Sequence, residues 1–136
     1  MEKVIICDID GVILDGPWYD DIEDFYNNMD SWTPVQWSVD LIQCMADKGY
    51  KIIFVTARIE RIRPKTTEQL QSVFNFPIDI RMRKNDDERV DWVMKKEIIQ
   101  ELQKTYDIQF GIDDGQLNCK MLQSLGITAL HVLPKE

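Results

Sequence analysis

The sequence lacks the features of membrane proteins and of disulfide-rich proteins. None of its apolar runs approaches the roughly 18 residues that a membrane-spanning helix needs. Met1–Lys3 leads directly into an apolar run, so we expect no signal peptide. The three cysteines, Cys7, Cys44 and Cys119, are an odd number without CxxC spacing, which predicts free buried thiols rather than a disulfide or a zinc site. We therefore expect a cytoplasmic protein without a membrane partner, located in the host cytoplasm if a phage encodes it.

Basic residues are also scarce. The chain has 16 lysines and arginines against 24 aspartates and glutamates, and this net charge of −8 argues against binding of extended duplexes by the surface as a whole. Residues 15–30 hold six acids and no base, whereas eight of the basic residues fall in 58–65 and 81–89. A phosphate-bearing ligand should be drawn to the basic stretches and not to the acidic one. No GxxxxGK(S/T) motif occurs, so the sequence carries no kinase P-loop.

Apolar runs and helical patterns alternate along the 136 residues, with no repeat, linker or low-complexity tract. This organisation predicts one domain, 1–136, of the α/β class, in which right-handed crossovers build a parallel sheet with helices on both faces. The predicted strands are Lys3–Cys7, Lys51–Val55, Ile78–Met82, Ile108–Ile112 and Ile127–Val132. The predicted helices are one that starts at a Thr33–Pro34 N-cap and stops at Gly49, then Thr67–Phe74, Asp91–Tyr106 and Asp114–Leu125.

Two carboxylates stand where the first strand is expected to end. Asp8 and Asp10 are two residues apart, so their side chains point the same way at a strand end. Two like charges in one small space are costly unless a cation compensates them, and carboxylate oxygens suit Mg²⁺. We therefore expect metal-assisted chemistry at this end of the first strand.

Two more strand ends carry reactive side chains. Thr56, Ala57 and Arg58 follow the second strand, and Asp113 and Asp114 follow the fourth. Because ligands of open α/β sheets bind at the carboxyl ends of the strands, these groups should share one rim with the first two carboxylates. On that rim one carboxylate could attack phosphorus, a second could protonate the leaving oxygen and a third could hold the metal. The hydroxyl and the guanidinium could bind phosphoryl oxygens.

The motifs DIDGV, TAR and GIDDG, with a helical lysine between the last two, resemble the haloacid dehalogenase (HAD) superfamily of Mg²⁺-dependent phosphohydrolases over nearly the whole chain. The resemblance implies a Rossmann-like fold whose five strands lie in the order 5-4-1-2-3. It also implies that Asp8 is the nucleophile, while Asp10 is the general acid/base and lends its main-chain carbonyl to the metal. Thr56 would bind the phosphoryl group. Asp113 would be a metal ligand, and Asp114 would be a ligand or the neighbour of one.

Residues 87–98 are similar to the 3′-phosphatase domain of phage polynucleotide kinases. This similarity implies that Lys95, rather than the solvated Lys96, is the lysine of the family. It also aligns Arg58 and Arg83 with arginines that bind the substrate phosphate. Because no P-loop is present, the chain would correspond to the phosphatase half of such an enzyme.

Other residues near the motifs carry weaker expectations. Gly11 and Ala57, which adjoin motif side chains, are expected to contact substrate. The basic stretch 61–65 is either a track for phosphates or a solvated turn. Three tryptophans are interpreted as helix-packing residues: Trp32, Trp37 and Trp92.

The segment after the first strand, roughly 12–32, is too short for a cap domain and predicts a short flap over an essentially capless site. Leu14–Asp21 is acidic and aromatic and lacks the basic residue expected from the phage domain, which leaves the substrate open. An open site admits nucleotides, oligonucleotide ends or phosphoproteins, unless a second subunit covers it. Four aromatic residues of the flap either stack on a base or pack the flap onto the body, which we favour: Trp18, Tyr19, Phe25 and Tyr26.

Taken with the resemblance, these features predict a Mg²⁺-dependent phosphomonoester hydrolase that acts through an aspartyl-phosphate, with the 3′-phosphate end of a nucleic acid or nucleotide as its substrate. A mononucleotidase or small-metabolite phosphatase fits the acidic flap and the net charge equally well. A non-catalytic phosphate-binding module on the same fold is the alternative from a different class. An oligomer is compatible with all three interpretations.

Overall fold

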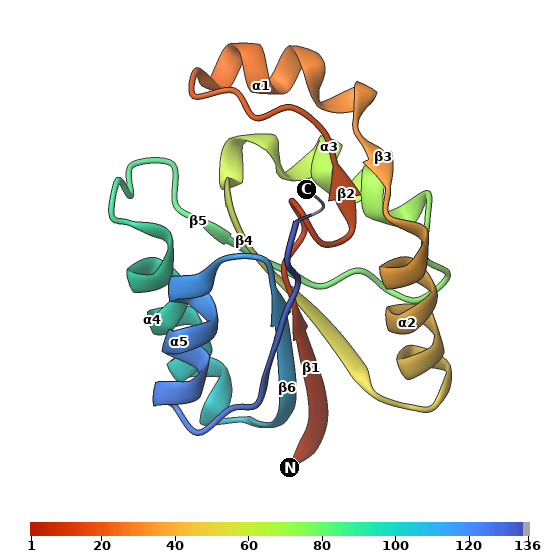
Figure 1. The fold of residues 1–136 in the computed structure, drawn as a ribbon, viewed down its shortest axis with the longest axis vertical. Helices are drawn as coiled ribbons and strands as arrows, with labels where there is room; N and C mark the ends of the chain where they lie inside the picture. Colours follow the sequence, from red (N-terminus) through yellow and green to blue (C-terminus); the bar gives the residue numbers. More distant parts are fainter. Residues whose placement is uncertain (135–136) are drawn as a thin grey trace.

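The computed structural model describes residues 1–134 and is built around a five-stranded parallel sheet (Figure 1). The strands lie in the order β5-β4-β1-β6-β7, which is the expected order 5-4-1-2-3 read from the β7 edge. Their bounds are β1 Glu2–Cys7, β4 Lys51–Ile59, β5 Ile80–Arg83, β6 Tyr106–Asp113 and β7 Ala129–His131. The predicted α/β, Rossmann-like class is therefore confirmed, with β1 in the middle of the sheet.

Helices cover both faces of the sheet because its strands are apolar on both faces. Ile5 and Cys7 of β1 pack into one hydrophobic cluster, whereas Val4 and Ile6 point the other way into a second. The first cluster is covered by α2 Gln36–Asp47 and, after the short turn η2 Glu60–Ile62, by α3 Arg63–Gln71. The second is covered by α4 Asp91–Gln103 and α5 Gln116–Ser124 (Figure 1). No helix within residues 1–134 is long and apolar enough to cross a membrane.

The flap lies over the carboxyl end of the sheet, at the top of Figure 1. It consists of β2 Leu14–Asp15, α1 Ile22–Asn28, the turn η1 Met29–Ser31 and β3 Thr33–Pro34. Its strands β2 and β3 pair antiparallel, and Phe25, Met29 and Trp32 are buried in the first cluster. The flap is therefore packed onto the body through its aromatic and sulfur-containing side chains.

The segment Thr33–Pro34 is not the helix N-terminus expected from the sequence. It forms β3 and pairs with β2, and the next residue, Val35, donates its N–H to the carbonyl oxygen of Ile13 at 2.8 Å. Helix α2 begins only at Gln36, and its N-cap makes no side-chain hydrogen bond. Pairing across the flap, which a local pattern does not reveal, overrides the cap signal.

Smaller expectations also fail at element boundaries and on α2. Strand β4 runs on to Ile59, so Thr56–Arg58 belongs to the strand and not to the turn after it. Helix α3 begins at Arg63, earlier than predicted. Trp37 is 52% exposed and Cys44 is exposed, so neither packs as expected.

We predict that Ile53→Ala destabilises the protein by about 2–5 kcal/mol. Ile53 is fully buried on β4, next to the central strand β1, in the cluster under α4 and α5, so truncation leaves a cavity that rigid strands cannot collapse. Chemical denaturation monitored by circular dichroism measures the loss. Gln123→Ala, on the exposed side of α5, is the control and should stay within about 0.5 kcal/mol of the wild type. Equal losses in the two variants would contradict the core position of Ile53.

Candidate active site

A cavity of about 360 Å³ lies between the carboxyl end of the sheet and the flap. Asp8 and Asp10 line it just beyond β1, Lys95 enters from α4 and Asp114 follows β6. The flap contributes Gly16, Trp18 and Trp32 to its wall. The cavity therefore collects charged groups from three elements of the body beneath an aromatic cover.

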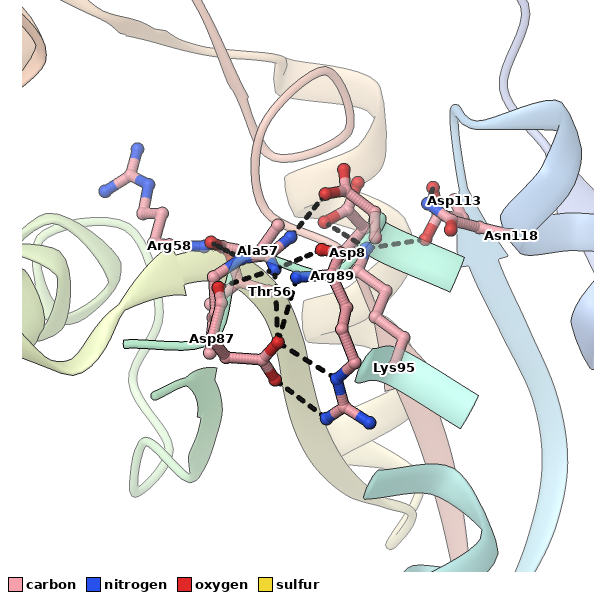
Figure 2. A network of polar contacts seen from close by, with 11 residues as sticks. Asp8, Thr56, Ala57, Arg58, Asp87, Arg89, Lys95, Asp113 and Asn118 are labelled. Carbon is pink, nitrogen blue, oxygen red and sulfur yellow. Dashed lines mark hydrogen bonds and ion pairs between the residues drawn. The ribbon is translucent and has the colours of Figure 1, made fainter. Parts of the chain in front are cut away.

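Lys95 joins the three elements, because it lies on α4 and contacts the ends of β1 and β6. Its ammonium Nζ donates to Asp8 Oδ1 at 3.1 Å and to Asp113 Oδ2 at 2.9 Å, as Figure 2 shows. The residue is only 3% exposed. Burial alone would lower the pKa of Lys95, but the two carboxylates raise it above its ordinary value, so the side chain remains a cation.

The pKa of Asp8 is raised well above its ordinary value, chiefly because burial disfavours the carboxylate. Repulsion from Asp113, Asp10 and Asp114 raises it further, and only Lys95 opposes the shift. Burial also raises the pKa of Asp114. Carboxylate oxygens of Asp8, Asp113 and Asp114 lie within 4.8 Å of one another. Three carboxylates facing one ammonium leave surplus negative charge, and a divalent cation is the species that could offset it.

Two neighbours orient the metal-binding candidates. Asp113 Oδ1 accepts hydrogen bonds from the Gly115 N–H at 2.9 Å and from Asn118 Nδ2 at 3.1 Å. Gly11 has a φ of +82°, and a Cβ there would lie 2.0 Å from Asp114 Oδ2. Glycine is thus required at position 11 both by the backbone turn and by the close approach of the Asp114 carboxylate.

Arg58 is paired with the carboxylate of Asp10. Its Nη2 lies 2.7 Å from Asp10 Oδ1, and its Nε lies 3.0 Å from Oδ2. The other edge of the guanidinium donates through Nη1 to Thr66 at 3.0 Å and to Gln69 at 2.7 Å. The side chain is 1% exposed. Its expected contact with substrate phosphate stays a prediction; in this structure Arg58 positions Asp10.

The guanidinium of Arg58 also lies against the flap. Its Cζ is 5.2 Å from the ring centroid of Phe25 and 5.8 Å from that of Trp32. Gln69, which accepts from Arg58, donates to the Met29 carbonyl oxygen at 2.7 Å. The flap and the carboxylate of Asp10 are therefore held by the same buried cation.

Arg83 connects the end of β4 to the start of α4. Its Nε donates to the Ala57 carbonyl oxygen at 3.1 Å, and its Nη2 lies 2.5 Å from Asp91 Oδ1. Its Nη1 donates to the Asp87 carbonyl oxygen at 3.0 Å. Thr56 is buried beside these groups, and its Oγ1 accepts from the Arg58 N–H at 3.1 Å. The roles of Arg83 and Thr56 in phosphate binding stay predictions, as does substrate contact by Ala57, which lines the cavity.

The basic stretch 61–65 is largely paired with acids. Arg61 pairs with Glu23 of the flap, and Lys65 Nζ lies 3.0 Å from Asp30 Oδ2. Arg63 pairs with Glu60 at 2.7 Å. These ion pairs favour the interpretation of a solvated turn, with the added feature that two of them fasten α3 and its preceding turn to the flap.

Asp91 and Asn118 are among the cavity residues that were not identified from the sequence. Asp91, the first residue of α4, lines the cavity four residues before Lys95, and Asn118 of α5 lines it four residues after Asp114. The signal was available for Asp91, because side chains at i and i+4 share one face of a helix and Lys95 lies on the same helix. Asp114 precedes α5, so no such signal pointed to Asn118. In Figure 2 Asn118 lies beside Asp113, and the Asp87 carboxylate accepts hydrogen bonds from Arg89.

Comparison with known proteins places this geometry in context. A family model described as the polynucleotide kinase PNKP phosphatase domain matches residues 2–136. No curated protein sequence matches the chain significantly.

Two solved structures contain similar chains. One belongs to the structure of the Pnkp1/Rnl/Hen1 RNA repair complex; it is 24% identical, has a TM-score of 0.81, and is matched over 99% of this chain and 43% of that one. The other belongs to the structure of the Pnkp1/Rnl/Hen1 complex; it is 25% identical, has a TM-score of 0.79, and is matched over 100% of this chain and 47% of that one. The chain thus spans less than half the length of both.

We predict that Asp8→Asn stabilises the metal-free protein. The raised pKa means that the folded state carries the ionised Asp8 at a cost that the unfolded chain does not have. Wild-type stability from this group should therefore fall as pH rises from about 4, the ordinary carboxyl value, towards the folded pKa. In EDTA the variant should be more stable by about 1 kcal/mol at neutral pH, and the difference should shrink towards pH 4.

Thermal unfolding at several pH values measures this difference. Asp40→Asn, at an exposed position of α2, is the matched control and should show no pH-dependent gain. An Asp8→Asn variant that is less stable than the wild type at every pH would show that the carboxylate stabilises the fold.

Proposed function

Because the chain belongs to the polynucleotide kinase PNKP phosphatase-domain family, and is thus a phosphatase of the HAD superfamily, we propose that it hydrolyses phosphomonoesters through an aspartyl-phosphate on Asp8 with Mg²⁺. The substrate that we propose is the 3′-phosphate end of a nucleic acid. The observation that carries the mechanism is the buried contact of Lys95 with Asp8 and Asp113, which assembles a nucleophile and a metal-ligating carboxylate around one cation.

Asp8 and Asp10 divide the chemistry between them. An Asp8 oxygen attacks phosphorus, the bond from phosphorus to the leaving oxygen breaks, and Asp10 gives that oxygen a proton. Water then attacks the aspartyl-phosphate, Asp10 takes a proton from this water, and inorganic phosphate leaves. Lys95 favours the ionised, attacking form of Asp8, and Arg58 holds the carboxyl of Asp10 at the cavity.

Asp8, Asp113 and Asp114 are proposed to hold the Mg²⁺, together with the main-chain carbonyl of Asp10. Their oxygens are close enough to share one ion, and an all-oxygen donor set is the kind that Mg²⁺ prefers. When bound, the ion offsets the repulsion between the carboxylates and the incoming phosphate. Asp113 is the best oriented of the three, because Gly115 and Asn118 hold one of its oxygens.

Three observations support a nucleic-acid end as the substrate. The matching family is defined by the phosphatase domain of a polynucleotide kinase. The two similar solved chains come from Pnkp1/Rnl/Hen1 complexes, one of which is an RNA repair complex. The flap consists only of β2, α1, η1 and β3, so no cap domain closes the cavity against a chain end.

The charge of the cavity favours a second candidate, a phosphatase of mononucleotides. Asp15 of the flap and Asp91 of α4 line the cavity in addition to the carboxylates already described, and Lys95 is the one basic residue among the lining residues. The other phosphodiesters of a bound strand would be repelled by these carboxylates, whereas a mononucleotide has no further phosphodiester.

We predict hydrolysis of a 3′-phosphorylated oligonucleotide with Mg²⁺, at a higher kcat/KM than that of a 5′-phosphorylated oligonucleotide or a nucleoside 3′-monophosphate. Release of inorganic phosphate measures each rate. Asp8→Asn should lower kcat by at least about 10³-fold because the nucleophile is lost, whereas Asp40→Asn should not change it.

Turnover of mononucleotides with the oligonucleotide untouched would favour the second candidate. Full activity of Asp8→Asn would instead refute the aspartyl-phosphate mechanism.

We predict that the effect of Asp10→Asn depends on the leaving group. A nucleotide hydroxyl needs a proton to depart, so kcat should fall by about 10²- to 10⁴-fold on a 3′-phosphate end. p-Nitrophenolate departs as a stable anion, so formation of the aspartyl-phosphate from p-nitrophenyl phosphate should be nearly unaffected. A rapid-mixing burst of p-nitrophenolate isolates that step. Equal losses in this step and on the nucleotide would contradict the role of Asp10 as general acid.

A further inference from the structure

Three aromatic residues of the flap, Trp18, Phe25 and Trp32, form a continuous wall beside the catalytic cavity, here called the aromatic wall. The rings of Trp18 and Phe25 meet edge to face, with centroids 5.0 Å apart, and those of Phe25 and Trp32 are 5.5 Å apart. Trp18 and Trp32 line the same cavity as Asp8 and Asp10. Trp18 and Trp32 therefore border the cavity in which Asp8 would attack a phosphate, and Phe25 lies behind them.

The three residues of the aromatic wall differ in how far their side chains are exposed to solvent. Phe25 is buried and packs the flap onto the body, which is the interpretation favoured for the flap aromatics from the sequence. Trp32, which was expected to pack on a helix, is buried in the same cluster. Trp18 is 60% exposed. Packing therefore accounts for Phe25 and Trp32 and leaves most of the Trp18 indole without a structural role.

The exposed indole of Trp18 is held in place. Its Nε1 donates to Asp20 Oδ1 at 3.2 Å, and its edge rests on the ring of Phe25. Phe25 in turn packs against the guanidinium of Arg58. An aromatic ring that is oriented before a ligand arrives loses little conformational entropy on binding, which is the property of a stacking platform.

Trp32 provides a second, independent indication of a ligand. Its Nε1 is buried, and among residues 1–134 it is the one buried side-chain nitrogen or oxygen without a hydrogen-bond partner. A buried N–H without an acceptor is costly, so such groups in native structures usually find their partner in a water or a ligand. Trp32 lines the catalytic cavity, but its Nε1 is buried, so an acceptor on the cavity's occupant reaches it only when the flap shifts.

We propose that the aromatic wall is the nucleoside subsite of the enzyme. The base of the terminal nucleotide stacks on Trp18, and an oxygen of its sugar or phosphate accepts from Trp32 Nε1. The inference rests on the proposed function and adds what the enzyme recognises beyond the phosphate. Because every base presents a π face, the subsite recognises the presence of a base and not its identity.

The experiment compares two oligonucleotides with the same 3′-phosphate, one ending in an ordinary nucleotide and the other in an abasic tetrahydrofuran residue. The wild type should show a kcat/KM about 5- to 100-fold higher for the substrate with the base, through KM rather than kcat. Trp18→Ala should remove this preference by lowering kcat/KM for the base-containing substrate to the abasic level. Trp18→Phe, which keeps a π face, should retain most of the preference.

Two matched variants control for general effects. Trp37→Ala removes an indole of similar exposure on α2 that does not line the cavity. This variant should leave kcat/KM for both substrates unchanged. Leu117→Ala probes the neighbouring hollow formed with Val90 and Trp92, and should leave the base preference unchanged. Trp32→Phe keeps an aromatic ring, although a smaller one, and removes the indole N–H, so it should lower kcat/KM for both substrates about equally. Thermal unfolding confirms that each variant is folded.

Each contrary result has a defined meaning. A wild type without a base preference, or a Trp18→Ala variant that loses activity equally on both substrates, would overturn the subsite. Loss of the base preference in Leu117→Ala would place the base in the other hollow. An unchanged Trp32→Phe variant would overturn the hydrogen bond assigned to Trp32.

Failure of the proposed substrate is distinguishable from failure of the subsite. If neither oligonucleotide is hydrolysed while mononucleotides are, the proposed substrate is wrong. The kcat/KM of the wild type and of the same variants is then measured on a nucleoside 3′-monophosphate, which has a base, and on glycerol 2-phosphate, which has none. A base preference that Trp18→Ala abolishes would still support the subsite, and no preference would overturn it.

Discussion

The contact of the Lys95 ammonium with two carboxylates is the interaction on which the rest of the site depends. A lysine buried to this degree is tolerated only with an opposite charge in direct contact, and removal of both partners would leave an uncompensated buried charge. The partners, Asp8 and Asp113, stand 87 and 18 residues away in the chain, at the ends of adjacent strands. The contact therefore forms only when β1, β6 and α4 are all in place, so the charge arrangement of the site is a property of the completed fold.

That contact also shows why the site is poised to bind a cation. Lys95 balances part of the negative charge of Asp8, Asp113 and Asp114, but burial and mutual repulsion still raise the pKa of Asp8 and Asp114. More lysines would neutralise the charge and occupy the space that a phosphate needs. A divalent ion neutralises the carboxylates while leaving coordination positions for substrate oxygens, which is the advantage of a metal over another side chain.

Much of the fold and of the site could be predicted because the signals are local. A short apolar run followed by Asp8 and Asp10 can be recognised in the sequence, and a parallel topology places the carboxyl ends of all strands at one edge of the sheet. What could not be predicted depends on pairing between distant segments. Thr33–Pro34 has the residue types of a helix cap, yet it becomes a strand because β2 lies opposite it. Arg58 has the residue type of a phosphate ligand, yet only the folded chain reveals that Asp10 and the flap surround it.

In the proposed mechanism Arg58 connects the flap to the proton donor Asp10, which a flap that only covered the cavity would not do. One face of its guanidinium packs against Phe25 and Trp32, and its edge holds the carboxylate of Asp10. Because Trp18 rests on Phe25, a base stacked on Trp18 would be connected to Asp10 through a continuous series of packed groups. Such packing transmits position rather than charge, since interiors are dense and resist compression. A substrate whose base stacks on Trp18 would therefore hold Phe25 and Arg58 in the arrangement that presents Asp10 to the leaving oxygen. Binding of the base and protonation of the leaving group would then depend on the same packed residues.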